Sequence, residues 1–232
     1  MKNLKKYSFL TLIFIIFSCK SKSNFIDNTE IPTIVEKVIF EIPIIIKPNP
    51  NDSTFVNLKD YSKDFVYDMK YATSDNFLNA KVYDCAECFL RYKTVKALIQ
   101  ANNSFLKLGF KIKLYDCYRP LDVQKKMWKI VSNPSYVANP GKGSIHNKGG
   151  AVDISLVDSF GNELDMGTKF DFFGQEAGHN FRKFSDKILE NRSLLKSIMI
   201  KSKFNSLDSE WWHYNLQSSL NDKISNERWK CD

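Results

Sequence analysis

The chain has 232 residues, enough for one ordinary domain with an appended segment and too few for two large domains. Hydrophobic residues make up 43% of it and charged residues 26%, so it can bury a core and is neither disordered nor fibrous. The formal charge is +8, and without Lys2, Lys5 and Lys6 of an expected N-terminal leader it falls to +5. This surplus is small, spread along the chain and attached to no recognisable binding motif, so we expect no nucleic-acid partner.

The N-terminus carries the pattern of an export signal. Its three lysines precede an apolar run from Phe9 to Phe17, which is too short to span a bilayer and ends at Ser18-Cys19. A small residue followed by cysteine resembles the lipobox of bacterial lipoproteins, which implies that Cys19 becomes the lipidated first residue of the mature chain. An ordinary signal peptide is the alternative. In both cases we expect the mature chain in the bacterial cell envelope, and with the lipobox it is a periplasm-facing lipoprotein held to a membrane through Cys19.

Composition divides the chain into three parts. We expect a lipoprotein-type signal peptide in residues 1–19, a tether in residues 20–54 and one folded domain in residues 55–232. The tether is polar at first and ends in Pro48-Asn49-Pro50, which disfavours regular structure.

Four cysteines remain beyond Cys19, an even set in a compartment that permits disulfides. They allow three pairings, and the sequence leaves the choice among them open. Cys85 and Cys88 form a CxxC pair, but no second CxxC and no βαβ pattern accompany it. We therefore expect structural disulfides or buried thiols rather than a redox or zinc-ribbon site.

Helix and strand patterns alternate beyond the tether. The spacing of apolar residues predicts a helix over residues 92–108, a strand over 110–115, a helix that begins after Pro120 and turns Val123, Met127, Ile130 and Val131 inward, a strand over 151–157, a helix over 192–201 and a strand over 210–216. The predicted fold class is α+β, a small and mainly antiparallel sheet packed with helices, with the functional site on the sheet.

Two short segments concentrate the chemistry. In the sequence SIHNKGGAVD, a turn with paired glycines separates His146 from Asp153 and can bring both side chains to one point. In the sequence EWWH, Glu210 and His213 stand three residues apart, and a regular strand would direct them to opposite faces. A site that uses both residues therefore requires a bulge, a twist or a helical turn here.

These residues have the composition of a catalytic zinc centre. Three oxygen or nitrogen ligands and an open fourth position hold catalytic zinc, and His146, Asp153 and His213 supply such a set. Glu210 is the candidate base for a bound water, and Arg119 is the candidate partner of a developing oxyanion.

Structural roles are the alternative for each of these residues. His179 has no ligand-like neighbours in the sequence, and we expect it to be structural. His146 and His213 differ from it because carboxylates, glycines or aromatic residues accompany them, which a merely structural histidine does not require.

Taken in chain order, these and other segments resemble the D-alanyl-D-alanine dipeptidases of the VanX type, a family of zinc peptidases. The segments are YATSDNF at residues 71–77, FLR at 89–91, DCYRP at 116–120, SIHNKGGAVD at 144–153, MGTKFDF at 166–172 and EWWHY at 210–214. A departure is Ser74, where members of this family often have tryptophan.

The resemblance implies a role for each matching residue in catalysis. It implies one Zn²⁺ per chain, bound by His146, Asp153 and His213. Glu210 is then the catalytic base and later the acid that protonates the leaving amine, and Arg119 stabilises the tetrahedral intermediate.

The resemblance also implies how the substrate is held. In this family a dipeptide-sized, nearly closed cavity binds the substrate at both ends. Asp171 and the main chain of Tyr71 match positions that receive the free ammonium group, and Ser144 matches a position near the carboxylate. A buried ammonium group needs an anion, so this arrangement is physically reasonable.

The expected function is zinc-dependent hydrolysis of the D-Ala-D-Ala dipeptide to two D-alanines during peptidoglycan turnover in the cell envelope. A resistance role needs a cytoplasmic enzyme, and the predicted leader argues against that location. Two alternatives remain: a zinc D,D-carboxypeptidase or wall endopeptidase of the same group, which needs an open groove, and a catalytically inactive, lipid-anchored module that binds the wall.

Overall fold

The computed structural model describes residues 49–230. The predicted signal peptide, with Cys19, and most of the predicted tether therefore lie outside the described residues. The chain divides into residues 1–46 and residues 47–232, and every described residue belongs to the second unit.

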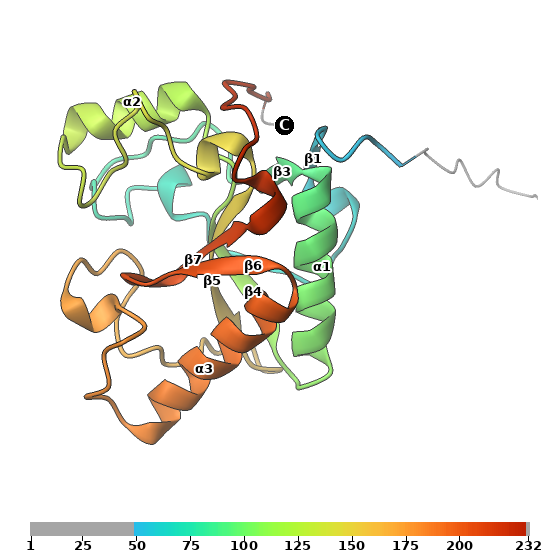
Figure 1. Cartoon of the computed structure of the whole chain (residues 1–232), viewed down its shortest axis with the longest axis vertical. Helices are drawn as coiled ribbons and strands as arrows, with labels where there is room; N and C mark the ends of the chain where they lie inside the picture. Colours follow the sequence, from blue (N-terminus) through green and yellow to red (C-terminus); the bar gives the residue numbers. More distant parts are fainter. Residues whose placement is uncertain (1–48, 231–232) are drawn as a thin grey trace, which may run out of the picture. The chain divides into compact units, whose positions relative to one another are not determined.

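A five-stranded sheet in the order β2-β4-β5-β7-β6 forms the centre of this unit (Figure 1). β2 runs parallel to β4, and all other neighbours in the sheet are antiparallel. A second, two-stranded sheet pairs β1 with β3. The strands are β1 (Phe55–Asn57), β2 (Val66–Tyr67), β3 (Phe89–Arg91), β4 (Lys111–Asp116), β5 (Ala151–Val157), β6 (Phe204–Leu207) and β7 (Glu210–Leu216).

Three α-helices accompany the described sheets. In Figure 1, α1 and α3 lie against each other and against the central sheet, while α2 is set apart from both. The predicted α+β class is therefore confirmed. The α-helices are α1 (Tyr92–Leu106), α2 (Leu121–Ile130) and α3 (Asp186–Lys201), and the 3₁₀ turns are η1 (Leu58–Asp60), η2 (Lys70–Ala72), η3 (His146–Lys148), η4 (Gln175–Ala177) and η5 (Gln217–Ser219).

The sequence patterns predicted the longer elements closely. The strands predicted over residues 151–157 and 210–216 match β5 and β7, and the helix predicted from residue 92 matches α1. α3 begins at Asp186, well before the predicted residue 192. The prediction that Ile130 faces inward is wrong, since this residue is 48% exposed at the end of α2.

Aromatic and branched side chains fill the core between the sheet and the helices. Trp211, Trp212 and Tyr214 of β7 are buried together with Phe105 of α1 and Phe204 of β6. Burial of a large apolar side chain stabilises a fold by roughly 1.5–3 kcal/mol, so these side chains hold β7 firmly in the fold. A rigid β7 matters because its first residue and its fourth were both predicted to serve the site.

A disulfide joins Cys88, which precedes β3, to Cys117, which follows β4. Both residues are fully buried, as expected for a structural disulfide. Because Cys88 pairs with Cys117 and not with Cys85, the CxxC pair is not a dithiol redox motif. Within residues 49–230, no helix has the length and apolarity needed to cross a membrane.

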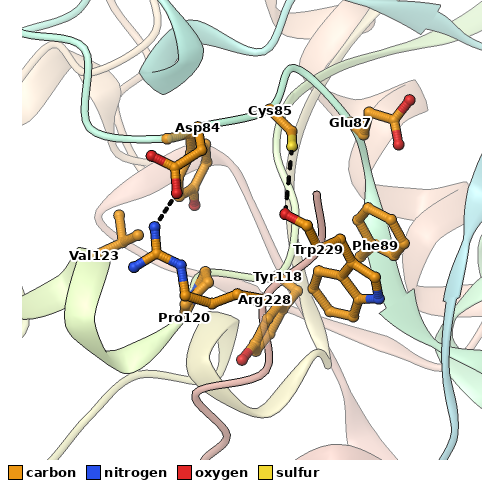
Figure 2. Close-up of a pocket in the computed structure, with 10 residues that line it drawn as sticks. Asp84, Cys85, Glu87, Phe89, Tyr118, Pro120, Val123, Arg228 and Trp229 are labelled. Carbon is orange, nitrogen blue, oxygen red and sulfur yellow. Dashed lines mark hydrogen bonds and ion pairs between the residues drawn. The ribbon is translucent and has the colours of Figure 1, made fainter. Parts of the chain in front are cut away.

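The chain that follows β7 returns along the fold and supports the turn before β5. Trp229 stacks on Phe89 with 3.8 Å between ring centroids, and Figure 2 shows the two rings beside each other at the edge of a small pocket. Further back, the amide of Ser225 donates to the carbonyl oxygen of Asn147 at 2.8 Å. Asn147 lies in η3, so this segment helps to fix the turn that carries His146.

Candidate active site

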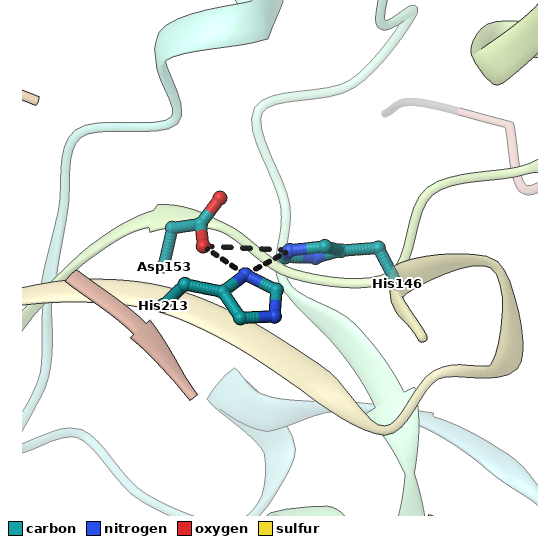
Figure 3. Close-up of side chains that lie close together, drawn as sticks. All are labelled: His146, Asp153 and His213. Atoms are coloured by element: carbon teal, nitrogen blue, oxygen red, sulfur yellow. Dashed lines mark hydrogen bonds and ion pairs between the residues drawn. The ribbon is translucent and has the colours of Figure 1, made fainter. Parts of the chain in front are cut away.

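Three predicted ligands meet above the middle of the central sheet (Figure 3). Asp153 of β5 and His213 of β7 are direct partners in the antiparallel register, which places both side chains on one face. His146 reaches the same point from η3, which ends at Gly149 with a φ of +70°. A Cβ at Gly149 would lie 2.3 Å from the ring of Phe55, so this turn requires glycine.

The spacing of the three inward atoms suits a small divalent cation. Asp153 Oδ1 lies 2.9 Å from His213 Nδ1 and 3.4 Å from His146 Nε2, and the two nitrogens are 3.2 Å apart. Ligands at about 2.0–2.1 Å from a tetrahedral zinc ion are roughly 3.3 Å from one another. The donor set therefore fits zinc in size as well as in chemistry.

In each imidazole, one ring nitrogen points toward the other two candidate ligands and one points away from them. The partner of the nitrogen that points away determines whether the inward nitrogen carries a lone pair. His146 Nδ1 is 2.7 Å from the carbonyl oxygen of Cys117, which only accepts, so this nitrogen carries the proton. His213 Nε2 donates in the same way to Oδ1 of Asn215 at 2.9 Å. Two lone pairs and the carboxylate of Asp153 then face one another at close range, and such a set is stable only around a positive charge.

The pKa shifts of Asp153 and His213 also indicate that this point of the fold favours a positive charge. Burial would raise the pKa of Asp153, but the neighbouring His146 and His213 hold it below its usual range. Burial would lower the pKa of His213, but the neighbouring carboxylate of Asp153 outweighs this effect and raises the pKa. This point in the fold therefore attracts a cation.

Glu210 reaches the site because β7 is irregular at its start. The pairing of β6 with β7 shifts register between Ser206 and Leu207, and Leu207 pairs with Glu210. This is the kind of irregularity that the spacing of Glu210 and His213 requires. Burial raises the pKa of Glu210, although the nearby His213 opposes this effect, and a carboxylate with a raised pKa is a better proton acceptor.

Arg119 follows β4 and is only 6% exposed. Its Nη2 donates to Oδ2 of Asp116 at 2.6 Å and its Nη1 donates to Oε1 of Gln124 at 2.9 Å. The guanidinium also lies over the ring of Tyr71, 5.3 Å from its centroid. Sequence reasoning missed the roles of Asp116 and Gln124, and the available signal was their closeness to Arg119 in the chain.

Asp171 is a partly buried carboxylate that no cation pairs with among the ion pairs of residues 49–230. Burial raises its pKa well above the usual range, and the negative charge of Asp153 adds to the effect. The hydroxyl of Tyr71 donates to Asp171 Oδ2 at 2.9 Å. The main-chain oxygen of Tyr71 already accepts hydrogen bonds from the amides of Val82 and Tyr83. Tyr71 therefore contacts Asp171 through its phenol and not through its main chain.

One cavity of about 250 Å³ unites the predicted residues. This is slightly smaller than the roughly 300–1,000 Å³ typical of sites for drug-sized ligands, so a small substrate suits it. The eight predicted residues that line it are Tyr71, Arg119, Ser144, His146, Asp153, Asp171, Glu210 and His213.

The segment after α2 contributes a wall of the cavity that sequence reasoning missed. Residues 134–136 and Ala138 line the cavity, and Tyr136 stacks on Phe173 with 4.4 Å between ring centroids. No local pattern marked this segment, because its contact with Phe173 depends on the tertiary fold. Ser144, beyond it in the chain, accepts a hydrogen bond from the amide of His146 at 3.0 Å through its hydroxyl oxygen.

His179 is not part of this group. It is buried next to Tyr214, with 6.4 Å between ring centroids, and its amide donates to the carbonyl oxygen of Asp208. Burial lowers its pKa to about 4, so it is neutral at physiological pH.

The chain is similar to known proteins over most of its described length. The family model described as D-ala-D-ala dipeptidase, of peptidase family M15, matches residues 51–230. The D-alanyl-D-alanine dipeptidase of Escherichia coli strain K12 is 31% identical over 182 residues, which cover 78% of this chain and 94% of that protein. Enzymes of the same name from Enterococcus faecium and Enterococcus faecalis strain V583 are 31% identical over 172 residues and 29% identical over 174 residues, each covering 65% of this chain and 85% of the relative.

Proposed function

The chain belongs to the D-alanyl-D-alanine dipeptidase family of M15 peptidases, and on this premise we propose that it is a zinc-dependent hydrolase that splits the D-Ala-D-Ala dipeptide into two D-alanines. The observation that carries the proposal is the cavity of about 250 Å³, which the candidate ligands, Glu210, Arg119 and Asp171 all line. Its size suits a dipeptide, and its residues supply a metal site, a base and two oppositely charged contacts.

The metal supplies one part of the chemistry. Zinc held by His146, Asp153 and His213 would act as a Lewis acid and lower the pKa of a bound water to about 7. The hydrogen-bond partners of the two imidazoles, Cys117 and Asn215, keep them oriented for this purpose.

Glu210 transfers the proton of the attacking water, and Arg119 stabilises the negative charge that develops on the substrate oxygen. Glu210 accepts a proton from the attacking water, whose oxygen bonds to the scissile carbonyl carbon. Glu210 then gives the proton to the leaving nitrogen as the C–N bond breaks, and the product amine departs neutral or protonated according to the pH. Arg119 is held in place by Asp116 and Gln124 and donates hydrogen bonds to the oxygen that carries the developing negative charge.

Asp171 gives the site its preference for a free amino terminus. A substrate ammonium group would form an ion pair with this partly buried carboxylate, and the phenol of Tyr71 keeps the carboxylate oriented. An acetylated amine carries no charge, so it could form no ion pair with Asp171. The hydroxyl of Ser144 lies on the cavity wall, where it can donate to the substrate carboxylate.

A substrate comparison tests this proposal. The chain from residue 20 onward, supplied with zinc, is expected to release D-alanine from D-Ala-D-Ala and not from its N-acetylated form. Asp171→Asn should raise KM for the free dipeptide, while Asp60→Asn, an exposed change outside the cavity, should leave KM unchanged. Cleavage of the acetylated dipeptide would favour a D,D-carboxypeptidase, and cleavage of neither would favour an inactive wall-binding module.

We also propose that the enzyme acts in the cell envelope as a lipoprotein anchored through Cys19, where it turns over dipeptide derived from peptidoglycan. The predicted leader and the Cys88–Cys117 disulfide support this proposal, because such disulfides persist in oxidising compartments. Radiolabelled palmitate should enter the wild-type protein in bacteria and be absent from Cys19→Ser. Equal labelling of both proteins, or of neither, would contradict the anchor.

A further inference from the structure

The loop of residues 166–178, which precedes α3, forms the Asp171 side of the cavity. Asp171 and Phe173 of this loop line the cavity, and Phe170 stacks on Tyr115 with 4.7 Å between ring centroids. Asp171 has a φ of +59°, a conformation that costs a non-glycine residue energy. Such a conformation persists only where the surrounding structure holds it, so the anchors of this loop matter to the site.

Arg192 of α3 holds the two ends of the 166–178 loop. Its Nε donates to the carbonyl oxygen of Met166 at 2.6 Å, and its Nη1 donates to the carbonyl oxygen of Gly178 at 3.1 Å. The adjacent Asn191 donates through Nδ2 to the carbonyl oxygen of Asp165 at 2.9 Å. One guanidinium therefore fixes the separation of the two ends of the loop.

Burying the charged Arg192 costs more free energy than filling the same space with an apolar side chain. It is only 4% exposed and lies over the ring of Phe184, 4.7 Å from its centroid. No ion pair joins it to a carboxylate within the described residues 49–230. Burial lowers its pKa to about 10, so it remains charged at neutral pH. An apolar side chain of similar volume would avoid this desolvation cost, which indicates a need for the forked donor itself.

We propose that Arg192 is a positioning residue for substrate selection: it fixes both ends of the 166–178 loop and so holds Asp171 where it can receive the substrate ammonium group. This inference rests on the proposed dipeptidase function. Lysine retains the charge but has no planar fork that can bond two carbonyl groups in fixed geometry. The loss of the fork should therefore loosen the loop without touching the metal ligands or Glu210.

The kinetic test uses Arg192→Lys, with Arg182→Lys as a matched control because Arg182 is exposed. We expect KM for D-Ala-D-Ala to rise about tenfold in Arg192→Lys while kcat changes by less than about threefold. The preference for the free over the N-acetylated dipeptide should fall with it. Asn191→Ala should shift KM in the same direction by a smaller factor, which keeps the test valid if Arg192→Lys folds poorly. Unchanged KM in both variants would overturn the proposal.

A second measurement needs no substrate. Hydrogen exchange of the zinc-loaded protein should be at least about tenfold faster in residues 166–178 of Arg192→Lys and unchanged in β5 and β7. Exchange that increases equally throughout the fold would assign Arg192 a merely structural role and overturn the proposal. If the wild-type protein leaves D-Ala-D-Ala intact, the proposed function fails, and the exchange data still decide whether Arg192 holds the loop.

Discussion

Glu210 is the residue whose proposed role differs most sharply from that of its neighbours. It lines the cavity three residues before His213, and burial raises its pKa while the three candidate ligands make their close contacts without it. A carboxylate in this position can exchange protons with a substrate or a water without binding the metal. We therefore expect mutation to separate catalysis from metal binding.

Glu210→Gln is expected to lower kcat by about 10²–10⁴-fold, because the amide cannot accept the proton, and to leave the zinc content near one per chain. Steady-state release of D-alanine and metal analysis of the same preparation check this. His213→Ala is the matched contrast, since it should lose both activity and zinc. A Glu210→Gln protein that loses its zinc would show that Glu210 is a ligand instead of a base.

At the scale of single elements, the disulfide between Cys88 and Cys117 ties the end of β4 to the segment before β3. The bonded cysteines are 29 residues apart, and closing a loop of this length stabilises a fold by about 3–4 kcal/mol through the unfolded state. Cys117 also accepts from His146, but it does so through its main-chain oxygen, which survives a change of side chain.

The double variant Cys88→Ala/Cys117→Ala should therefore lose about 3–4 kcal/mol of unfolding free energy and keep kcat within about fivefold under conditions in which it stays folded. Urea unfolding followed by circular dichroism measures the first quantity, and D-alanine release measures the second. A loss of less than about 1 kcal/mol would mean that the unfolded chain is already constrained without this disulfide.

The elements also show what could be predicted from sequence. β5 and β7 could be predicted because each is a seven-residue segment rich in aliphatic or aromatic residues, whereas the pairing of Asp153 with His213 depends on the register of the folded sheet. β2 has only two residues, and no periodicity can reveal so short a strand. Ile130 was misplaced because helical spacing does not show where a helix leaves the core.

The residues of the site also fall into those that the sequence indicates and those that it does not. Short motifs carry the candidate ligands and Glu210, so the sequence could point to them, whereas Tyr136 reaches the cavity only through the tertiary fold. The main chain of Tyr71 was expected to receive the ammonium group, but two backbone amides occupy its carbonyl oxygen. A motif match assigns a position and does not reveal the hydrogen bonds already made there.

At the scale of the whole molecule, residues from position 71 to position 213 converge on one cavity, so global stability governs the site. His179 lies outside the cavity and makes that stability dependent on pH. Burial, followed by the positive charges of Lys196 and Arg192, lowers its pKa from 6.5 to about 4. The folded protein therefore keeps His179 neutral at pH values at which the unfolded chain protonates it.

The sign of the effect follows from this depressed pKa. Above about pH 6.5 neither state binds the proton and the contribution of His179 to stability is complete; as the pH falls toward about 4, the unfolded state gains protons first and that contribution is lost. Between pH 7 and pH 5 the loss should be about 2 kcal/mol. His179→Gln cannot titrate, so its unfolding free energy should fall by about that much less over the same interval.

Urea unfolding of both proteins at pH 7 and pH 5 measures this difference. Protonation of the candidate metal ligands destabilises the wild type and His179→Gln alike, so subtracting one pH dependence from the other isolates His179. Equal pH dependence of the two proteins would mean that His179 is as accessible to protons in the folded chain as in the unfolded chain. A smaller dependence in His179→Gln would make this buried histidine, rather than the catalytic residues alone, a determinant of the lower pH limit of the enzyme.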